Sequence, residues 1–520
     1  MALWARSRIL TGMSAATTYD ELPYTNNPFY YTHPSNLAVL PSMLGMRPAP
    51  VDRCRVLDMG CGLGGNLVPM AELLPDSRFV GIDLSARQIE AGQEAVRALG
   101  LTNIELKALS IGDIDTSFGE FDYIICHGVY SWVPAAVQQA ILRVCKQNLA
   151  PAGVAYVSYN CYPGWHFRGM IREMMQFHVR QFDQPGQKIQ QARALMSFLV
   201  KAVARTRIYS DLMKLEAGML EHHTDTYLFH EYLEEVNQPL YFHQFAERAQ
   251  AVGLQYVGEA TNVPLPQNLD PDVLQTLEDV ATDLVHAEQY LDFLRNRFFR
   301  RTLLCHDDVK LQRPLSPAAI MSTRVSTLVR PERTDTGTSF SSPDGPSLTT
   351  NHPLLVAALT LLHESHPCSL TFAELWDRTR ARLQEQGLSV EGWTDPQALA
   401  EPLMQCALSD LVELHAWEPP LVMHAAQYPR ATLLARLQAA NDVGVTNLRH
   451  RKVKLENLDR FVLAHLDGTR DREALLSILK EAAAKGALGV DGQADVSAER
   501  LREALEGTLN RLGRGGYLMA

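Results

Sequence analysis

Residues 56–66 read VLDMGCGLGGN, in which a short apolar run leads into four closely spaced glycines. A strand, a tight turn and the start of a helix are the structures that this pattern indicates. Gly60 permits the tight turn, Gly62 lets a ligand approach the backbone, and Gly64 allows the helix to pack closely on the strand. The stretch therefore predicts a nucleotide-binding loop near the start of an α/β fold.

Strand-like and helix-like segments alternate from residue 51 to residue 160. The helical stretches are residues 66–74, 86–99 and 135–149, and the β-rich runs are CRVLDMG, RFVGIDL, NIELKAL, FDYIICHG and GVAYVSYN. Strands that alternate with helices at this spacing predict a parallel, Rossmann-like sheet with helices on both faces.

The acid before the first glycine separates two kinds of nucleotide ligand. A dinucleotide would place its pyrophosphate at the helix N-terminus. There the carboxylate of Asp58 would repel it by on the order of 1 kcal/mol or more. S-adenosyl-L-methionine (SAM) carries no phosphate, and an acid attracts its ammonium and sulfonium groups. The stretch also has no GK[ST] of a P-loop, so SAM is the favoured ligand.

A second acid, Asp83, ends the next predicted strand nineteen residues after Gly64. A carboxylate at that position accepts hydrogen bonds from both ribose hydroxyls of a nucleoside. A plain capping role stays open both for Asp83, which precedes a helix, and for Asp58 at its strand end.

Further cofactor contacts are expected where the third and fourth strands end. Ser110 and Ile111 would flank the adenine, with Asp113 near its amino group, and the fourth strand ends at His127-Gly128. The predicted cofactor-binding residues are Asp58, Gly60, Cys61, Gly62, Gly64, Asn66, Asp83, Leu84, Gln88, Ser110, Ile111, His127, Gly128 and Tyr130.

Aromatic residues gather after the fourth and fifth strands, in HGVYSWVP (127–134) and SYNCYPGWH (158–166). Ligands of open α/β sheets bind beyond the carboxyl ends of the strands. Aromatic faces hold cations, and tyrosine hydroxyls orient amines. In-line methyl transfer depends mainly on positioning and requires no metal. We predict that Tyr159, Tyr162 and Trp132 position the acceptor, with core packing as the alternative.

The remaining chain is mostly helical by its periodicity. Residues 166–220 and 268–312 repeat apolar positions at helical spacing. Residues 330–352 are rich in Ser, Thr, Pro and Gly, which predicts a linker. A helix–helix–strand rhythm follows and suits a winged-helix-like region at 353–520. The leucines of the last helix are expected to pack in its core.

Composition limits the other functions. A chain of 520 residues predicts two to four domains. The net charge of −11 argues against a general nucleic-acid binder. Eight cysteines without a CxxC pair or zinc-ligand spacing predict free thiols, no metal and a reduced, cytoplasmic setting. No apolar run approaches the roughly 20 residues of a membrane helix. The start of the chain (1–14) is expected to be a disordered leader or to result from a start site placed upstream of Met13.

Several segments together resemble one family. LPYTNNPFYYTHPSNLA, VLDMGCGLGGNL, EFDYIICHGVYSWVP and GVAYVSYNCYPGW are similar to class I SAM-dependent methyltransferases that bear a methyltransferase regulatory domain. The rickettsial-type protein lysine methyltransferases have a similar layout. The resemblance is close over residues 19–310 and looser from 350. No NPPY follows the fourth strand, which departs from amide and adenine-N6 methyltransferases.

The resemblance implies the domain organisation and the partners. We expect an N-terminal leader and SAM lid at 1–50, a SAM-binding core at 51–165, a helical regulatory and dimerisation region at 166–329, the linker at 330–352, and the winged-helix-like region. The lid would include Tyr24, Asn26, Asn27, Tyr30 and His33. A homodimer acting on a protein substrate is expected.

Three functions follow from these features. The first is a SAM-dependent protein lysine N-methyltransferase. The second is a small-molecule N- or O-methyltransferase, with the helical region as a cap. The third is a non-catalytic SAM-binding regulator that acts through its C-terminal region.

Overall fold

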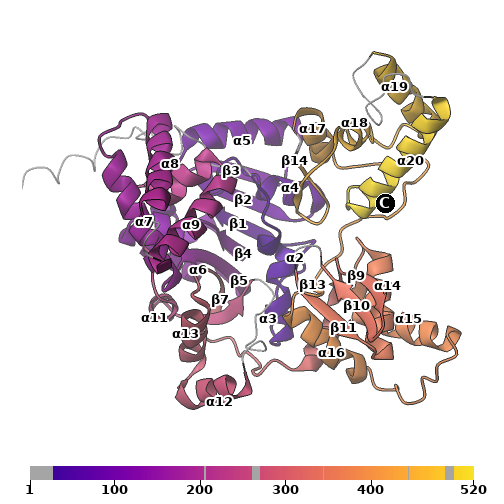
Figure 1. Cartoon of the computed structure of the whole chain (residues 1–520), viewed down its shortest axis with the longest axis horizontal. Helices are drawn as coiled ribbons and strands as arrows, with labels where there is room; N and C mark the ends of the chain where they lie inside the picture. The colour runs from indigo at the N-terminus through magenta and orange to yellow at the C-terminus, as the bar shows by residue number, and fades with distance from the viewer. Residues whose placement is uncertain (1–26, 204–206, 261–269, 343–344, 443, 486–496) are drawn as a thin grey trace, which may run out of the picture.

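A computed structural model describes residues 27–203, 207–260, 270–342, 345–442, 444–485 and 497–520 (Figure 1). The expected leader and the lid residues Tyr24 and Asn26 lie outside the described residues. The described chain forms an α/β core, a helical region beside it and a C-terminal region in two parts.

A seven-stranded sheet with the order β3-β2-β1-β4-β5-β7-β6 lies at the centre of the core. The five predicted strands are all present and pair in parallel. They are β1 (Arg55–Met59), β2 (Arg78–Asp83), β3 (Ile104–Ala108), β4 (Phe121–Cys126) and β5 (Leu149–Asn160). The predicted Rossmann-like sheet is confirmed.

Helices cover both faces of this sheet, as predicted. Val56 packs on one face with α4 (Leu67–Leu73) and α5 (Ala86–Ala98). Its neighbour Leu57 packs on the other face with α6 (Ala135–Gln147). Successive residues of a strand point to opposite faces, so the apolar run that enters the glycine loop serves two cores.

One strand of the seven-stranded sheet was not predicted. Residues 268–312 contain the expected helices α12 (Pro271–Val280) and α13 (Leu284–Arg295), but residues 299–306 form β7 (Phe299–His306). This strand lies antiparallel between β5 and β6 (Leu254–Glu259). Its consecutive buried residues, Leu303 to Cys305, face cores on both sides of the sheet. A continuous apolar run has no period that distinguishes a strand from a buried helix.

The helical region after β5 forms its own core. It consists of α7 (Gly164–Val179), α8 (Pro185–Ala202), α9 (Arg207–His222), α10 (Asp225–Leu228) and a π-helical turn, η5 (Phe229–Leu233). Ile171, Met175, Met196 and Met213 are buried together there. Figure 1 places α7, α8 and α9 side by side at one end of the molecule. The chain then returns to the sheet through α11 (Phe242–Ala251).

The predicted linker at 330–352 is wrong. The described part of it folds as an antiparallel sheet of β9 (Arg330–Thr334), β10 (Gly337–Ser341) and β11 (Ser347–Thr350). Phe340 is fully buried and anchors this sheet on α14 (Pro353–Ser365). Threonine suits a pleated, half-exposed surface, so a polar composition did not exclude strands here.

The C-terminal region has two parts with separate cores. The first combines α14, α15 (Phe372–Glu385) and α16 (Gln397–Leu408) with β8 (Arg324–Ser326), β12 (Leu370–Thr371) and β13 (Glu413–His415). The second, called here the terminal module (residues 420–520), comprises α17 (Leu433–Asn441), β14 (Gly444–Thr446), β15 (Lys452–Lys454), α18 (Asn457–Ala464), α19 (Arg472–Ala484) and α20 (Ala498–Arg514). The leucines of α20 are buried in its core, as predicted: Leu501, Leu505, Leu509 and Leu512.

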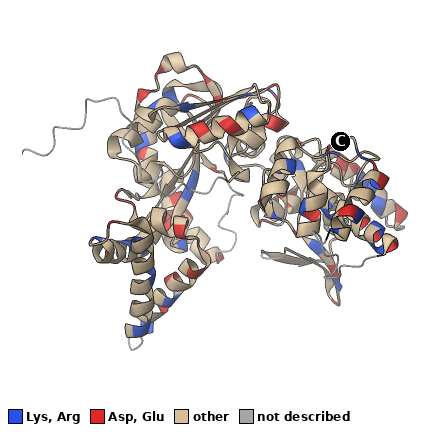
Figure 2. Cartoon of the chain, turned by 90° about the horizontal axis from the view of Figure 1, so that it is seen from above, with Lys and Arg blue, Asp and Glu red and all other residues tan. Residues whose placement is uncertain are grey.

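Charge is mixed over the described chain. Figure 2 shows acidic and basic residues interspersed along the helices. All eight cysteines are free, and seven of them are buried, as predicted. Within the described ranges, no helix combines the length and the apolar character needed to cross a bilayer.

Candidate functional site

The glycine loop follows β1 and folds back on β2. Gly60, Gly62 and Gly64 have φ of +86°, +55° and +79°, a region that side chains with a Cβ rarely adopt. A Cβ on Gly60 would lie 2.4 Å from a methyl of Val129. The amides of Gly60 and Cys61 both donate to the carbonyl of Ile82. The loop therefore needs glycine for its backbone conformation and, at Gly60, for space.

Asp58 lies near the end of β1 with only 3% of its surface exposed. Burial, with the nearby charge of Asp83, raises its pKa to about 7, and a hydrogen bond from Asn66 opposes that rise. The amide nitrogen Nδ2 of Asn66 donates to Asp58 Oδ2 at 3.3 Å. A buried carboxylate with little compensation favours a cation beside it.

Asp83, at the end of β2, shapes the same loop. Its Oδ2 accepts from the amide of Gly62 at 2.9 Å, and its Oδ1 accepts from the amide of Ser85 at 2.9 Å. Ser85 caps α5 by accepting from the amide of Gln88. The N-cap of α5 is therefore Ser85 and not Asp83, whose carboxylate holds the turn before the helix and lies directly against the glycine loop.

The other residues predicted to contact the nucleoside lie around Asp83 and differ in how exposed they are. Gln88 is buried, and its Oε1 lies 3.1 Å from where a Cβ on Gly62 would be. Leu84 is 58% exposed. After β3, the amide of Leu109 donates to the carbonyl of Asp83, and Ser110 begins a short helical turn over Ile111–Asp113. The loops after β1, β2 and β3 thus meet at one edge of the sheet.

His127, just beyond β4, lies in a buried polar cluster. Its Nδ1 is 2.9 Å from the hydroxyl of Tyr156 and 3.1 Å from that of Ser158. Burial and the charge of Arg301 lower its pKa to about 3, so the ring is neutral at neutral pH. Gly128, with a φ of +68°, donates its amide to Ser158 Oγ at 2.8 Å.

The N-terminal segment from Asn27 to His33 crosses this edge, where the lid was expected. The amide of Phe29 donates to Asn66 Oδ1 at 3.1 Å, and its ring lies 4.1 Å from that of His127. The Tyr31 hydroxyl is 3.4 Å from His127 Nε2. Phe29 and Tyr31 were not among the predicted lid residues, although they alternate with Tyr30 in the same stretch.

The predicted lid residues Tyr30 and His33 contact the C-terminal region instead. The guanidinium of Arg451 lies 4.0 Å from the centre of the Tyr30 ring. His33 stacks on Trp417 with ring centres 5.9 Å apart. A hollow lies at this junction, and no residue of the glycine loop lines it. The segment thus joins the core to the C-terminal region.

Two predicted site residues lie on the opposite face of the sheet. Tyr130 and Tyr159 are buried and pack against Phe245 of α11. The Tyr159 hydroxyl is 3.1 Å from that of Thr302. Because side chains alternate along β5, Tyr156 and Ser158 point toward His127 while Tyr159 points away. Neither Tyr130 nor Tyr159 has the exposed surface that contact with a cofactor or acceptor requires.

Tyr162 and Trp132 are partly exposed on the side of the helical region. Tyr162 stacks on His166 with ring centres 4.1 Å apart. Trp132 meets Trp165 edge to face at 6.0 Å. None of these contacts brings either ring to His127. The residues beside His127 that were not predicted from the sequence are Tyr156 and Arg301.

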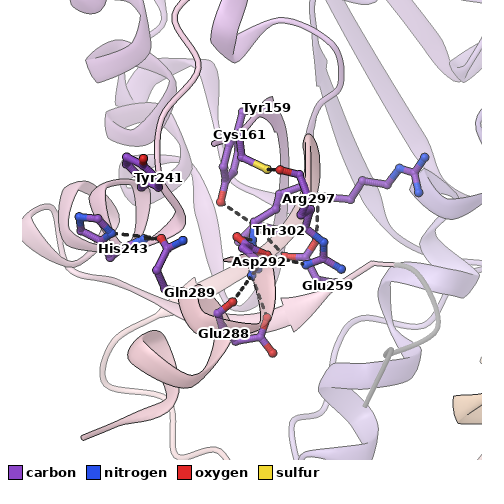
Figure 3. Close-up of polar contacts among 12 residues, drawn as sticks. Tyr159, Cys161, Tyr241, His243, Glu259, Glu288, Gln289, Asp292, Arg297 and Thr302 are labelled. Atoms are coloured by element: carbon purple, nitrogen blue, oxygen red, sulfur yellow. Dashed lines mark hydrogen bonds and ion pairs between the residues drawn. The ribbon is translucent and has the colours of Figure 1, made fainter. Parts of the chain in front are cut away.

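A buried charge cluster supports the sheet beneath Tyr159 (Figure 3). Arg300 is fully buried and pairs with Glu259, Asp292 and Glu288 at 2.8, 2.8 and 2.9 Å. Burial alone would raise the pKa of Glu259, but the charge of Arg300 outweighs the effect of burial and holds this pKa below its usual value. Thr302 links Glu259 to Tyr159. The cluster fastens β6, β7 and α13 together, so these contacts are structural.

The residues at this edge fit SAM. A buried carboxylate at Asp58 suits its positive groups, the glycine loop leaves the backbone open to a ligand, and Asp83 lies beside that loop. Among the described residues, no cluster of histidine, cysteine and acidic side chains is arranged to hold a metal ion. With the sheet order, these features define a class I SAM-dependent methyltransferase.

Models of known protein families match three parts of the chain. A methyltransferase domain model matches residues 50–235, a predicted methyltransferase regulatory domain matches 224–306, and a PKMT C-terminal winged helix domain matches 427–514. The chain belongs to the SAM-dependent methyltransferases that carry these regulatory and winged helix domains, and SAM is its cofactor.

Individual relatives cover nearly the full length. An uncharacterized protein of Rickettsia prowazekii (strain Madrid E) is 36% identical over 505 residues, which cover 94% of this chain and 90% of that protein. The structure of PKMT2 from Rickettsia typhi matches with a TM-score of 0.86 at 30% identity, covering 96% of this chain and 100% of that one. The complex of the same PKMT2 with AdoHcy matches with a TM-score of 0.84 at 31% identity, over the same shares.

Proposed function

We propose that this methyltransferase transfers the methyl group to lysine side chains of a protein. The observation that carries the proposal is the full-length similarity to PKMT2 from Rickettsia typhi, because it includes both accessory regions as well as the core. By contrast, an arsenite methyltransferase and a trans-aconitate 2-methyltransferase match only 21% and 20% of this chain. The lysine assignment is therefore a proposal by similarity, which the local chemistry supports.

The cofactor contacts follow from the geometry at the sheet edge. We assign Asp58 to the positively charged end of SAM and Asp83 to its ribose. Asp58 is buried beside Asn66, and Asp83 lies against the amide of Gly62. SAM supplies an activated methyl group, so the protein needs only to align and deprotonate the acceptor.

The acceptor amine must be neutral when it attacks, whereas a free lysine has a pKa of about 10.4. Arg301 lies 4.2 Å from the centre of the Tyr31 ring, and its charge helps to lower the pKa of His127. The positive charge of Arg301 also disfavours a second cation at this point, so a substrate amine that binds here is favoured in its neutral form. We therefore place the acceptor beside Tyr31 and His127.

The products of the reaction test the proposal directly. Purified protein is incubated with SAM labelled in its methyl group and with a bacterial lysate, and the labelled material is hydrolysed to amino acids. Label recovered as methyl-lysine is expected, and the Asp58→Asn variant should transfer far less. Label on small metabolites alone would instead support the small-molecule methyltransferase, and SAM binding without transfer would support the regulator.

We also propose that the helical region forms a homodimer contact. Phe177, Phe198, Ile208 and Leu215 are exposed on α7, α8 and α9, with Ile208 79% exposed. Apolar side chains gathered on neighbouring helices are typical of an interaction surface. Sedimentation equilibrium of the protein and of a Phe198→Ser, Ile208→Ser variant tests this: the parent should be a dimer and the variant a monomer.

A further inference from the structure

The terminal module reaches the cofactor site through one tight loop. Residues 447–451 connect β14 to β15, and the side chain of Asn447 holds them in place. Its Oδ1 accepts from the amides of Arg449 and Arg451 at 3.1 and 3.0 Å. The backbone closes the loop with a bond from the Asn447 amide to the Arg451 carbonyl at 2.9 Å. The residue at the tip is therefore presented in a fixed position.

That residue is His450, which has an uncommon backbone conformation. Its φ is +59°, in the left-handed region that few residues other than glycine adopt. Its side chain is 2% exposed although it leaves its own module. A buried polar side chain on a left-handed backbone, aimed out of the module that carries it, points to a contact that matters beyond that module.

The contact is with Asn66, 384 residues earlier in the chain. His450 Nε2 lies 3.0 Å from Asn66 Oδ1. The carbonyl oxygen can only accept, so the imidazole nitrogen donates. Burial and the neighbouring His33 lower the pKa of His450 well below its ordinary value. The ring is therefore neutral, and its single N–H is the one that faces Asn66.

Asn66 connects His450 to the cofactor site. Its Oδ1 also accepts from the amide of Phe29 and from the hydroxyl of Thr32, both at 3.1 Å, so His450 is one of three donors that hold that oxygen. The amide nitrogen on the other side then faces Asp58 and donates to it at 3.3 Å. Loss of the His450 donor leaves only the two contacts from the N-terminal segment at Oδ1, so the amide turns over more readily, and its oxygen would then repel the carboxylate.

We infer that His450 is a positioning residue for SAM binding: it orients the Asn66 amide toward Asp58 and so makes cofactor affinity depend on the terminal module. This inference rests on the proposed cofactor-binding role of Asp58. A second contact keeps the module in place. Glu72 of α4 accepts from the amide of Leu433 at the start of α17 at 2.6 Å. His450 thus reaches Asn66 from a module that is already fastened to the core.

The test compares variants of the full chain by titration calorimetry with SAM. In His450→Asn the residue still tolerates the left-handed backbone but is too short to reach Asn66. We expect SAM affinity to fall about 3- to 10-fold, with KM for SAM raised and kcat at saturating SAM retained. His450→Gln, whose amide reaches further, should recover part of the affinity. His465→Asn, in the same module with its ring bonded to its own helix at Phe461, should bind SAM normally.

A double variant separates positioning from general support. If His450 acts through Asn66, His450→Asn should cause no further loss of affinity in an Asn66→Ala background. Independent, multiplying losses would overturn the inference, as would a lower melting temperature of His450→Asn with unchanged SAM affinity. The Asp58→Asn variant distinguishes a failure of the cofactor assignment from a failure of the role of His450. Unchanged SAM binding in Asp58→Asn would overturn the cofactor assignment itself, whereas loss there with normal binding in His450→Asn would overturn only the role of His450.

Discussion

The two ends of the cofactor site are held by different kinds of contact. At the ribose end, Asp83 bonds to Gly62, 21 residues earlier, within one strand–loop–strand unit. At the Asp58 end, Asn66 is held by Phe29, Thr32 and His450, which lie 37, 34 and 384 residues away in the chain. The first end depends on local backbone geometry, while the second depends on how three regions of the chain dock. A substitution should therefore act through loop strain at one end and through orientation at the other.

The largest effect is expected when the glycine loop at the ribose end is disrupted. Gly60→Ala places a Cβ on a left-handed backbone and 2.4 Å from Val129, which should lower the free energy of unfolding by about 3 kcal/mol. Gly100→Ala is the matched control, because Gly100 has a φ of +66° but no atom within 4 Å of the new Cβ. It should cost about 1 kcal/mol. Urea unfolding of both variants measures the difference, and equal losses would mean that the contact with Val129 relaxes freely.

The second-largest effect is expected when Asp83, the acid at the ribose end, is replaced. Asp83→Ala should weaken SAM binding by about 1–3 kcal/mol, through lost hydrogen bonds to the ribose and a loosened Gly62 amide. Titration calorimetry measures it. Asp115→Ala, in the exposed turn before β4, is the control and should bind SAM as the parent does. Normal SAM affinity in Asp83→Ala would mean that the ribose lies elsewhere.

The third effect is the pH dependence of the other end. The folded pKa of Asp58, about 7, lies above its unfolded value of about 3.9. Its ionisation therefore costs stability as pH rises from about 4 to 7, and a bound cation offsets that cost. SAM affinity should fall up to about tenfold per pH unit below 7 as Asp58 takes up a proton.

Affinity measurements between pH 5.5 and 8 test this dependence. Burial lowers the pKa of His33 and His127 to about 3, so neither titrates in that window. Asp58→Asn should bind weakly with a flat pH profile. A parent profile that is equally flat would show that the charge of Asp58 does not contribute.

The smallest effect concerns docking of the terminal module. Glu72→Gln weakens the acceptor at the start of α17, where the helix dipole favours a negative charge. We expect a loss of about 1 kcal/mol in the free energy of unfolding. Glu481→Gln, whose exposed side chain pairs with Lys485, is the control and should change stability by less. Urea unfolding compares the two, and equal small losses would mean that Glu72 contributes little to docking.

The same division explains what the sequence could predict. The strand–loop–helix order around VLDMGCGLGGN is local and periodic, so β1 to β5 and the helices between them were predicted correctly. The sides taken by Tyr156 and Tyr159 follow from alternation along β5 and could have been assigned from it. By contrast, β7 has a continuous apolar run, and the β9–β11 sheet has few apolar residues. Neither pattern indicates its structure without the neighbours that bury it.

The contact from His450 had no sequence signal. A single histidine in a short basic stretch has many ordinary explanations, and its partner Asn66 is 384 residues away. Only the docked position of the terminal module brings the two together. Long-range polar contacts of this kind depend on the tertiary structure, whereas the glycine loop depends on a few consecutive residues.

The position of His450 also has a consequence for the synthesis of the enzyme. A ribosome delivers the chain from its N-terminus, and early segments begin to fold before later ones exist. The glycine loop is made well before its partner His450, which follows Asn66 by 384 residues. A growing chain therefore carries a cofactor site with one donor missing, and the newborn enzyme completes that site only after the loop that carries His450 has emerged.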